Sequence, residues 1–247
     1  MLGSDLVRYL HTKYEVIPID RESYQMHIGK SFDILINANG NSKRFWANQN
    51  PQDDFLASTV SVYKSIFDFQ SDIYIYISSP DVYENHTGTK STNEAQKINA
   101  ENLSPYGFHK YLSELIVKKH KEKYFILRCS MILGTRLKKG PLYDITHKNP
   151  LHITLKSKLQ FITTHAISEV IETLFEKSQV NETMNVGGID TFAFTKTSAF
   201  FNHKIQTLPE VETQVYELNI EKLRKLYPSL KTSEEYLQEF LKNYSNL

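Results

Sequence analysis

The sequence predicts an α/β fold in which helices cover a parallel sheet. Three observations support this prediction. Continuous apolar runs at 34–36, 73–77 and 124–127 are rich in Ile, Leu, Tyr and Phe, which is typical of parallel strands buried on both faces. Segments with helical periodicity alternate with these runs. The 247 residues are enough for one large domain, or for one domain with a small lobe.

Composition excludes several classes of protein. The formal net charge is +1 and 23% of residues are charged, so no strong field marks the chain for nucleic acid or membrane surfaces. No apolar run is long enough to span a bilayer, and the N-terminus does not resemble a secretory signal. The single cysteine, Cys129, cannot form an internal disulfide and fits a reducing compartment. We therefore expect a cytoplasmic protein without nucleic-acid or membrane partners.

The N-terminal segment predicts a helix followed by a strand. Residues 1–10 carry a helical apolar stripe that includes Leu2, Leu6 and Leu10. Residues 14–20 then predict a strand that ends in the carboxylate of Asp20. A helix joined in this way to a strand is the second half of a β-α-β unit.

The middle of the chain predicts two strands and a helix between them. Residues 31–36 form a buried strand, followed by the small and polar residues Asn37 to Gly40. Residues 51–69 predict a helix with Pro51 in its first position. Residues 72–79 predict the next strand, which ends in two hydroxyl groups and delivers Ser79 to the carboxyl edge of the sheet.

A Tyr and a Lys spaced for catalysis follow that strand. Tyr106 and Lys110 lie four residues apart in a segment that opens with Ser-Pro, and on a helix they share one face. A Tyr that acts as an acid or base near neutral pH needs a pKa lowered from about 10, and a nearby ammonium lowers it by favouring the phenolate. Ser79 is placed to bond the substrate oxygen that Tyr106 protonates or deprotonates.

These motifs resemble the extended short-chain dehydrogenase/reductases, within the NAD-dependent epimerase/dehydratase family that acts on nucleotide sugars. The resemblance runs from Gly3 to about Tyr244. It implies a doubly wound, Rossmann-like parallel sheet with a small C-terminal substrate lobe, divided into residues 1–133 and 134–247. It also implies that Ser79, Tyr106 and Lys110 are the catalytic residues.

The chain departs from the family at its start. Gly3 resembles the third glycine of the phosphate-binding motif, but the first strand and the first two glycines are absent. Either the sequence begins after them, or the chain has lost part of its cofactor site. Neighbouring strands would keep unpaired backbone groups, so we expect reduced stability or compensation by a partner chain.

The resemblance implies a nicotinamide cofactor and residues that hold it. Asp20 corresponds to the ligand of the adenosine ribose, and Arg21 is placed to meet a 2′-phosphate. NAD is therefore slightly favoured over NADP. The cofactor-binding residues that we predict are Gly3, Asp20, Arg21, Asn37, Ala38, Asn39, Tyr106 and Lys110.

The predicted substrate is a nucleotide-linked sugar. We assign Ser79, Asp81 and Arg136 to substrate binding. Arg136, with Lys138 and Lys139, is placed either to meet the nucleotide diphosphate or to form a solvated basic loop. No spacing of His, Cys or acidic residues indicates a metal site.

The predicted chemistry is hydride transfer between the nicotinamide and a sugar carbon. Family dehydratases carry an Asp-Glu pair directly after the catalytic hydroxyl, but this chain has Pro80 and Asp81 there, so a reductase or epimerase ranks above a dehydratase. The alternative is a catalytically inactive binding or scaffold protein, because the phosphate-binding turn is missing. The resemblance also implies a homodimer through helices that include that of Tyr106. The apolar stripe of this helix, Leu112, Leu115 and Ile116, fits either such an interface or the core.

Overall fold

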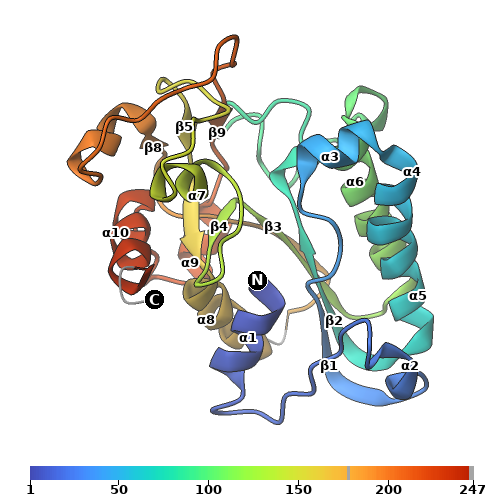
Figure 1. Cartoon of the computed structure of the whole chain (residues 1–247). Coiled ribbons are helices and arrows are strands. Elements are labelled where there is room, and N and C mark those ends of the chain that lie inside the picture. The colour runs from blue at the N-terminus through green and yellow to red at the C-terminus, as the bar shows by residue number, and fades with distance from the viewer. Residues whose placement is uncertain (177–178, 245–247) are drawn as a thin grey trace.

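A computed structural model describes residues 1–176 and 179–244. Its main sheet contains four parallel strands in the order β1-β2-β3-β7 (Figure 1). The strands are β1 (Ser31–Asn37), β2 (Gln70–Ser78), β3 (Tyr124–Cys129) and β7 (Glu182–Val186). The register pairs Ile36 with Ile75, and Ile75 with Phe125. This sheet confirms the predicted α/β class with parallel strands.

Helices cover both faces of the sheet (Figure 1). One face carries α1 (Leu2–Leu10) and α8 (Thr164–Phe175), which contact each other. The other face carries α5 (Ser61–Asp68) and α6 (Pro105–His120), which also pack together. A buried apolar cluster lies between α5, α6 and the sheet; it consists of Val62, Ile66, Tyr74, Tyr76, Val117 and Ile126. The fold is therefore layered and doubly wound, as predicted.

The predicted helix over residues 51–69 contains a π-helical turn. It consists of α4 (Pro51–Asp54), the π segment η1 (Phe55–Val60) and α5. Pro51 occupies the first turn as predicted, and the helix ends at Asp68. A π turn inserts an extra residue and is often found near functional sites.

The remaining elements include two small sheets. Strands β4 and β6 pair in parallel, and β5 is the centre of a three-stranded sheet in the order β8-β5-β9. No helix among the described residues is long and apolar enough to cross a membrane. These elements are α2 (Tyr24–His27), α3 (Arg44–Gln49), η2 (Pro80–Val82), η3 (Ala100–Asn102), β4 (Met131–Leu133), α7 (Pro141–Thr146), β5 (Lys158–Leu159), β6 (Phe161–Thr163), β8 (Phe192–Ala193), η4 (Phe194–Ala199), β9 (Val215–Tyr216), α9 (Glu221–Leu226) and α10 (Ser233–Tyr244).

The predicted strand over residues 14–20 is wrong. Residues 15–20 have no regular secondary structure. Hydrogen bonds tie only the ends of the segment, from the Tyr14 amide to the Leu10 carbonyl and from the Asp20 amide to Ser23 Oγ. The physical reason is that no strand among the described residues lies beside this segment, so the segment has no ladder to join.

The two edges of the main sheet differ. At β7, Glu94 Oε1 accepts from the Asn185 amide at 2.9 Å, and Lys222 Nζ donates to the Thr183 carbonyl at 2.9 Å. At β1, no described residue outside β2 hydrogen-bonds to the strand backbone. Residues 34–36 are partly exposed there, although residues 74–77 of β2 are buried. The edge of β1 is therefore open in the described part of the chain.

Gly134 sets the distance between α1 and α8. The carboxylate of Asp5 on α1 is 1% exposed, and it accepts from Thr135 Oγ1 at 3.1 Å and from Thr164 Oγ1 at 2.9 Å. A side chain on Gly134 would place its Cβ 2.6 Å from Asp5 Oδ2 and 2.8 Å from Thr164 Cγ2.

We therefore expect Gly134→Ala to lower the free energy of unfolding by about 1–3 kcal/mol, which is the usual cost of overpacking. Urea denaturation followed by circular dichroism measures this change. Gly88→Ala is the matched control, because its Cβ would lie 3.9 Å from the nearest atom outside its neighbours. Equal stability of the two variants would contradict the prediction.

Candidate active site

The turn after β2 and the start of α6 bring Ser79 and Tyr106 together. Ser104 caps α6 by accepting from the Gly107 amide at 3.3 Å, and Pro105 occupies the first turn. A Cβ on Gly107 would overlap the carbonyl oxygen of Asp81. The missing side chain therefore lets the start of the helix lie directly against the turn that follows Ser79.

Tyr106 and Lys110 are both buried, with exposures of 7% and 6%. Lys110 Nζ donates to the Ile77 carbonyl at 3.2 Å and lies 5.2 Å from the centre of the Tyr76 ring. The Tyr106 amide donates to Asn48 Oδ1 of α3 at 3.1 Å. The end of β2 and the helix α3 thus hold the two side chains in place.

The electrostatics of Tyr106 differ from the prediction. Burial and, to a smaller extent, the charge of Asp81 raise the pKa of Tyr106, whereas the charge of Lys110 and the nearby Ser79 hydroxyl lower it. Burial outweighs the lowering causes, and the resulting pKa is about 12. Lys110 therefore acts in the expected direction, but burial keeps the pKa of Tyr106 above its usual value, so that Tyr106 is a protonated phenol at neutral pH.

Asp81 connects Ser79 to two other parts of the chain. Ser79 Oγ donates to Asp81 Oδ2 at 2.8 Å. Tyr216 of β9 donates its hydroxyl to Asp81 Oδ1 at 2.9 Å, and Arg44 Nη1 of α3 lies 3.2 Å from the same oxygen. Arg44 Nη2 also donates to Gln214 Oε1 at 3.1 Å. Sequence reasoning missed Arg44 and Tyr216 because these contacts join residues far apart in the chain, with no local pattern.

A fully buried ion pair lies beneath Ser79. Arg128 on β3 and Glu114 on α6 are 2% and 0% exposed, and they form two hydrogen bonds of 2.9 and 2.7 Å. Ser78 Oγ donates to Glu114 Oε1 at 2.6 Å, and Arg128 Nη1 donates to Tyr83 OH at 2.8 Å. The sequence carried a weak signal for this pair, since Glu114 lies one helical turn after Lys110.

The end of β1 and the loop that follows it contain predicted cofactor residues, and Gly40 of this loop lies close to Lys110. Asn37 is buried, donates to Ser65 Oγ and Tyr74 OH, and accepts from the Asn39 amide. The Cβ position of Gly40, where φ is +111°, is 3.5 Å from Ser58 Oγ and 3.6 Å from Lys110 Nζ. A glycine here leaves open space beside the ammonium.

Gly3 lies near the same strand end. Its Cβ position is 3.8 Å from the Cβ of Ala38. The start of α1 and the end of β1 therefore meet at the carboxyl edge of the sheet, as the resemblance implies.

Asp20 and Arg21 are not brought to this site by any described contact. Asp20 is exposed, and its Oδ1 accepts from the Ser23 amide, the Ser23 hydroxyl and the Glu22 amide. The hydrogen bonds from Ser23 hold the pKa of Asp20 below its usual value. The carboxylate stabilises its own turn here, and its role in binding ribose stays a prediction.

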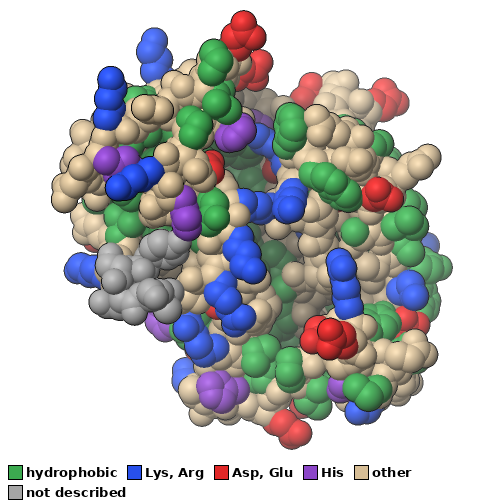
Figure 2. Space-filling model, viewed as in Figure 1, with side chains coloured by type: hydrophobic (Ala, Val, Ile, Leu, Met, Phe, Trp, Pro, Cys, Tyr) green, Lys and Arg blue, Asp and Glu red, His purple; other side chains and the backbone are tan. Residues whose placement is uncertain are grey.

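Basic side chains line a hollow in the middle of one face of the molecule (Figure 2). Arg136 is exposed, whereas Lys139 is half-buried. Burial and, to a smaller extent, the nearby charge of Lys43 lower the pKa of Lys139 to about 8. A bound anion would relieve this repulsion.

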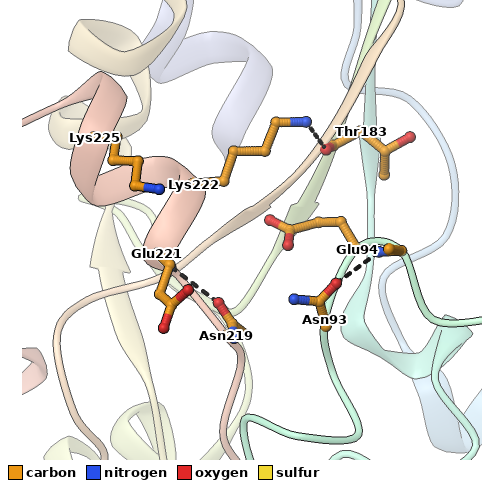
Figure 3. A pocket seen from close by; sticks show the side chains of 8 residues that line it. Asn93, Glu94, Thr183, Asn219, Glu221, Lys222 and Lys225 are labelled. Atoms are coloured by element: carbon orange, nitrogen blue, oxygen red, sulfur yellow. Dashed lines mark hydrogen bonds between the residues drawn. The ribbon is translucent and has the colours of Figure 1, made fainter.

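A second hollow lies at the edge of β7 (Figure 3) and has a volume of ≈ 450 Å³. It contains none of the predicted site residues, and its Glu94 and Lys222 bind the backbone of β7. The residues that line it are Asn93, Glu94, Ala95, Thr183, Asn219, Glu221, Lys222 and Lys225. In the described part of the chain, no group of three or more His, Cys, Asp or Glu residues is arranged to hold a metal ion.

A comparison with family models places most of the chain in one family. The model of the NAD dependent epimerase/dehydratase family matches residues 1–187. No curated protein matches the sequence.

Solved structures resemble the fold across nearly the whole chain. UDP-glucose 4-epimerase from Thermotoga maritima, solved with UDP-glucose, has a TM-score of 0.73 at 16% identity, over 100% of this chain and 96% of that one. dTDP-4-dehydrorhamnose reductase from Bacillus anthracis, solved with NADP, has a TM-score of 0.73 at 17% identity, over 97% of this chain and 93% of that one. RMD from Pseudomonas aeruginosa, solved with NADPH, has a TM-score of 0.76 at 13% identity, over 100% of this chain and 96% of that one. At these identities the likeness shows the fold alone.

We expect Glu114→Ala to lower the free energy of unfolding by about 3–5 kcal/mol, because it leaves the buried guanidinium of Arg128 without its counter-charge. Chemical denaturation measures the loss. Glu234→Ala is the control, since its pair with Lys196 is exposed and should contribute less than about 1 kcal/mol. A loss at Glu114 as small as that of the control would show that the buried pair does not stabilise the fold.

Proposed function

Because the chain belongs to the NAD-dependent epimerase/dehydratase family, we propose that it is an NAD(P)-dependent oxidoreductase acting on a nucleotide-linked sugar. One observation carries the proposal: Ser79, Tyr106 and Lys110 meet at the carboxyl end of β2. Nucleotide sugars and nicotinamide cofactors are bound by structural neighbours, which supports this class of substrate and cofactor. NAD is slightly favoured, because Asp20 is the acid expected at the ribose.

The residues near Lys110 fit a nicotinamide ribose. The small residues Gly3, Ala38 and Gly40 leave the backbone accessible, and Lys110 Nζ borders the space beside Gly40. When bound, the nicotinamide accepts or supplies a hydride. In this proposal Lys110 holds the ribose hydroxyls, and Asn37, Ala38 and Asn39 border the cofactor.

Tyr106 and Ser79 act on the reacting oxygen of the sugar. Tyr106 gives its phenolic proton to a ketone oxygen, or takes a proton from a hydroxyl in the reverse direction. The ammonium of Lys110 stabilises the phenolate that forms. Ser79 positions the oxygen by a hydrogen bond.

A reductase or epimerase is favoured over a dehydratase. Pro80 carries no acid, and both oxygens of Asp81 already accept hydrogen bonds from Ser79, Tyr216 and Arg44. Arg136, Lys138 and Lys139 supply positive charge for the diphosphate of the nucleotide.

A second candidate is a catalytically inactive binding or scaffold protein. Two observations favour it. The edge of β1 is open, and residues 15–20 form no strand, so the part of the site that would hold the phosphates is not built by the described residues.

Titration with NADH and NADPH, followed by nicotinamide fluorescence, separates the two candidates. We expect micromolar binding of at least one of them, and a loss of turnover in Tyr106→Phe of roughly 10²–10⁴-fold. Tyr14→Phe is the control, since Tyr14 is exposed and contacts Phe175. A folded protein that binds neither cofactor would favour the inactive candidate.

We also propose a homodimer through α5 and α6. Exposed apolar side chains gather on these two helices, including Tyr63 (47%), Phe67 (58%) and Leu115 (42%). Light scattering coupled to size-exclusion chromatography should give twice the monomer mass for the parent protein. For Phe67→Glu it should give the mass of a monomer. Ile17→Glu is the control, because Ile17 is similarly exposed at 42% but follows α1. A monomeric parent protein would contradict the proposal.

A further inference from the structure

The hydroxyl group of Ser79 donates its one proton in a hydrogen bond to Asp81. Ser79 Oγ donates to Asp81 Oδ2 at 2.8 Å and accepts from the Asp81 amide at 3.3 Å. A hydroxyl has one proton to donate. Ser79 therefore has no donor left for a ketone oxygen while this hydrogen bond persists.

The carboxylate of Asp81 is fixed from its other side. Oδ1 accepts from Tyr216 OH at 2.9 Å and from Arg44 Nη1 at 3.2 Å. Among the described residues, Ser79 is the one side chain that donates to Oδ2. A carboxylate oxygen can accept two hydrogen bonds, so Oδ2 keeps one position for a further donor.

Substrate binding must change this arrangement, if the chain performs the proposed reduction. Ser79 has to turn its proton toward the reacting oxygen, and Oδ2 then loses its donor. The side chain of Asp81 is only 14% exposed, and a largely buried acceptor without a donor is unfavourable. A donor on the substrate would remove this penalty.

We propose that Asp81 is a specificity-determining residue. Its Oδ2 gives up the hydrogen bond from Ser79 and accepts one from a sugar hydroxyl group on the carbon next to the reacting carbon. The site accordingly takes sugars with a free hydroxyl beside the carbon that is reduced or oxidised. This inference rests on the proposed function, since it requires a sugar substrate at Ser79.

The geometry fits two neighbouring oxygens of one sugar ring. Ser79 Oγ and Asp81 Oδ2 are 2.8 Å apart. Adjacent hydroxyl oxygens on a pyranose lie about one hydrogen-bond length apart, roughly 2.8 Å. One ring can therefore place the reacting oxygen at Ser79 and Tyr106 while its neighbour donates to Asp81. Because Arg44 and Tyr216 hold Oδ1, the carboxylate cannot turn away from that neighbour.

The test compares binding of UDP-glucose and dTDP-glucose with that of their 2-, 3-, 4- and 6-deoxy analogues by calorimetry, with NAD or NADP present. In the parent protein, one deoxy position should weaken binding roughly tenfold or more, because a hydrogen bond to a charged group is lost. In Asp81→Ala the ratio of the dissociation constant of that deoxy analogue to that of the full sugar nucleotide should fall to about one. Because both constants are measured on the same variant, a smaller fraction of folded protein does not change this ratio.

Two controls sharpen the test. In Ser79→Ala the same ratio of dissociation constants should be retained or increased, because no hydrogen bond from Ser79 to Asp81 has to break before the sugar hydroxyl binds. Glu84→Gln removes a carboxylate that pairs with Asn102 and should leave every ratio unchanged. If the parent protein binds a nucleotide sugar and Asp81→Ala keeps the discrimination, the role of Asp81 is wrong while the proposed function stands. If no nucleotide sugar binds, the proposed function is overturned and this inference with it.

Discussion

The buried ion pair between Glu114 and Arg128 is the interaction on which the site depends. It joins α6 to β3, and Ser78 attaches the end of β2 to the same carboxylate. Tyr83 and Asn185 extend the chain of hydrogen bonds to β7. Two charges in a buried position are expensive unless fully paired. The pairing therefore fixes how the helix sits relative to three strands.

The positions of the reacting groups follow from this constraint. Ser79 comes directly after Ser78, while Lys110 lies about one helical turn and Tyr106 about two helical turns before Glu114. The close approach at Gly107 then sets the distance between the helix and the turn. The hydroxyl, the phenol and the ammonium are thus placed by a rigid frame of backbone.

Much of the fold could be predicted because its signals are local. Apolar runs indicated β1, β2 and β3, and the Tyr-Lys spacing indicated the face of α6. Three features could not be predicted. The segment over residues 14–20 has strand composition but no partner. The pKa of Tyr106 depends on burial, which a spacing does not reveal. The contacts of Asp81 with Arg44 and Tyr216 depend on tertiary packing.

The two edges of the main sheet differ in whether they can pair with a further strand. The side chains of Glu94 and Lys222 hydrogen-bond to the backbone of β7. Backbone groups that are bonded in this way cannot pair with a strand of another chain. Among the described residues, the backbone of β1 has no comparable cover. In this part of the chain, a further strand can therefore extend the sheet only along β1.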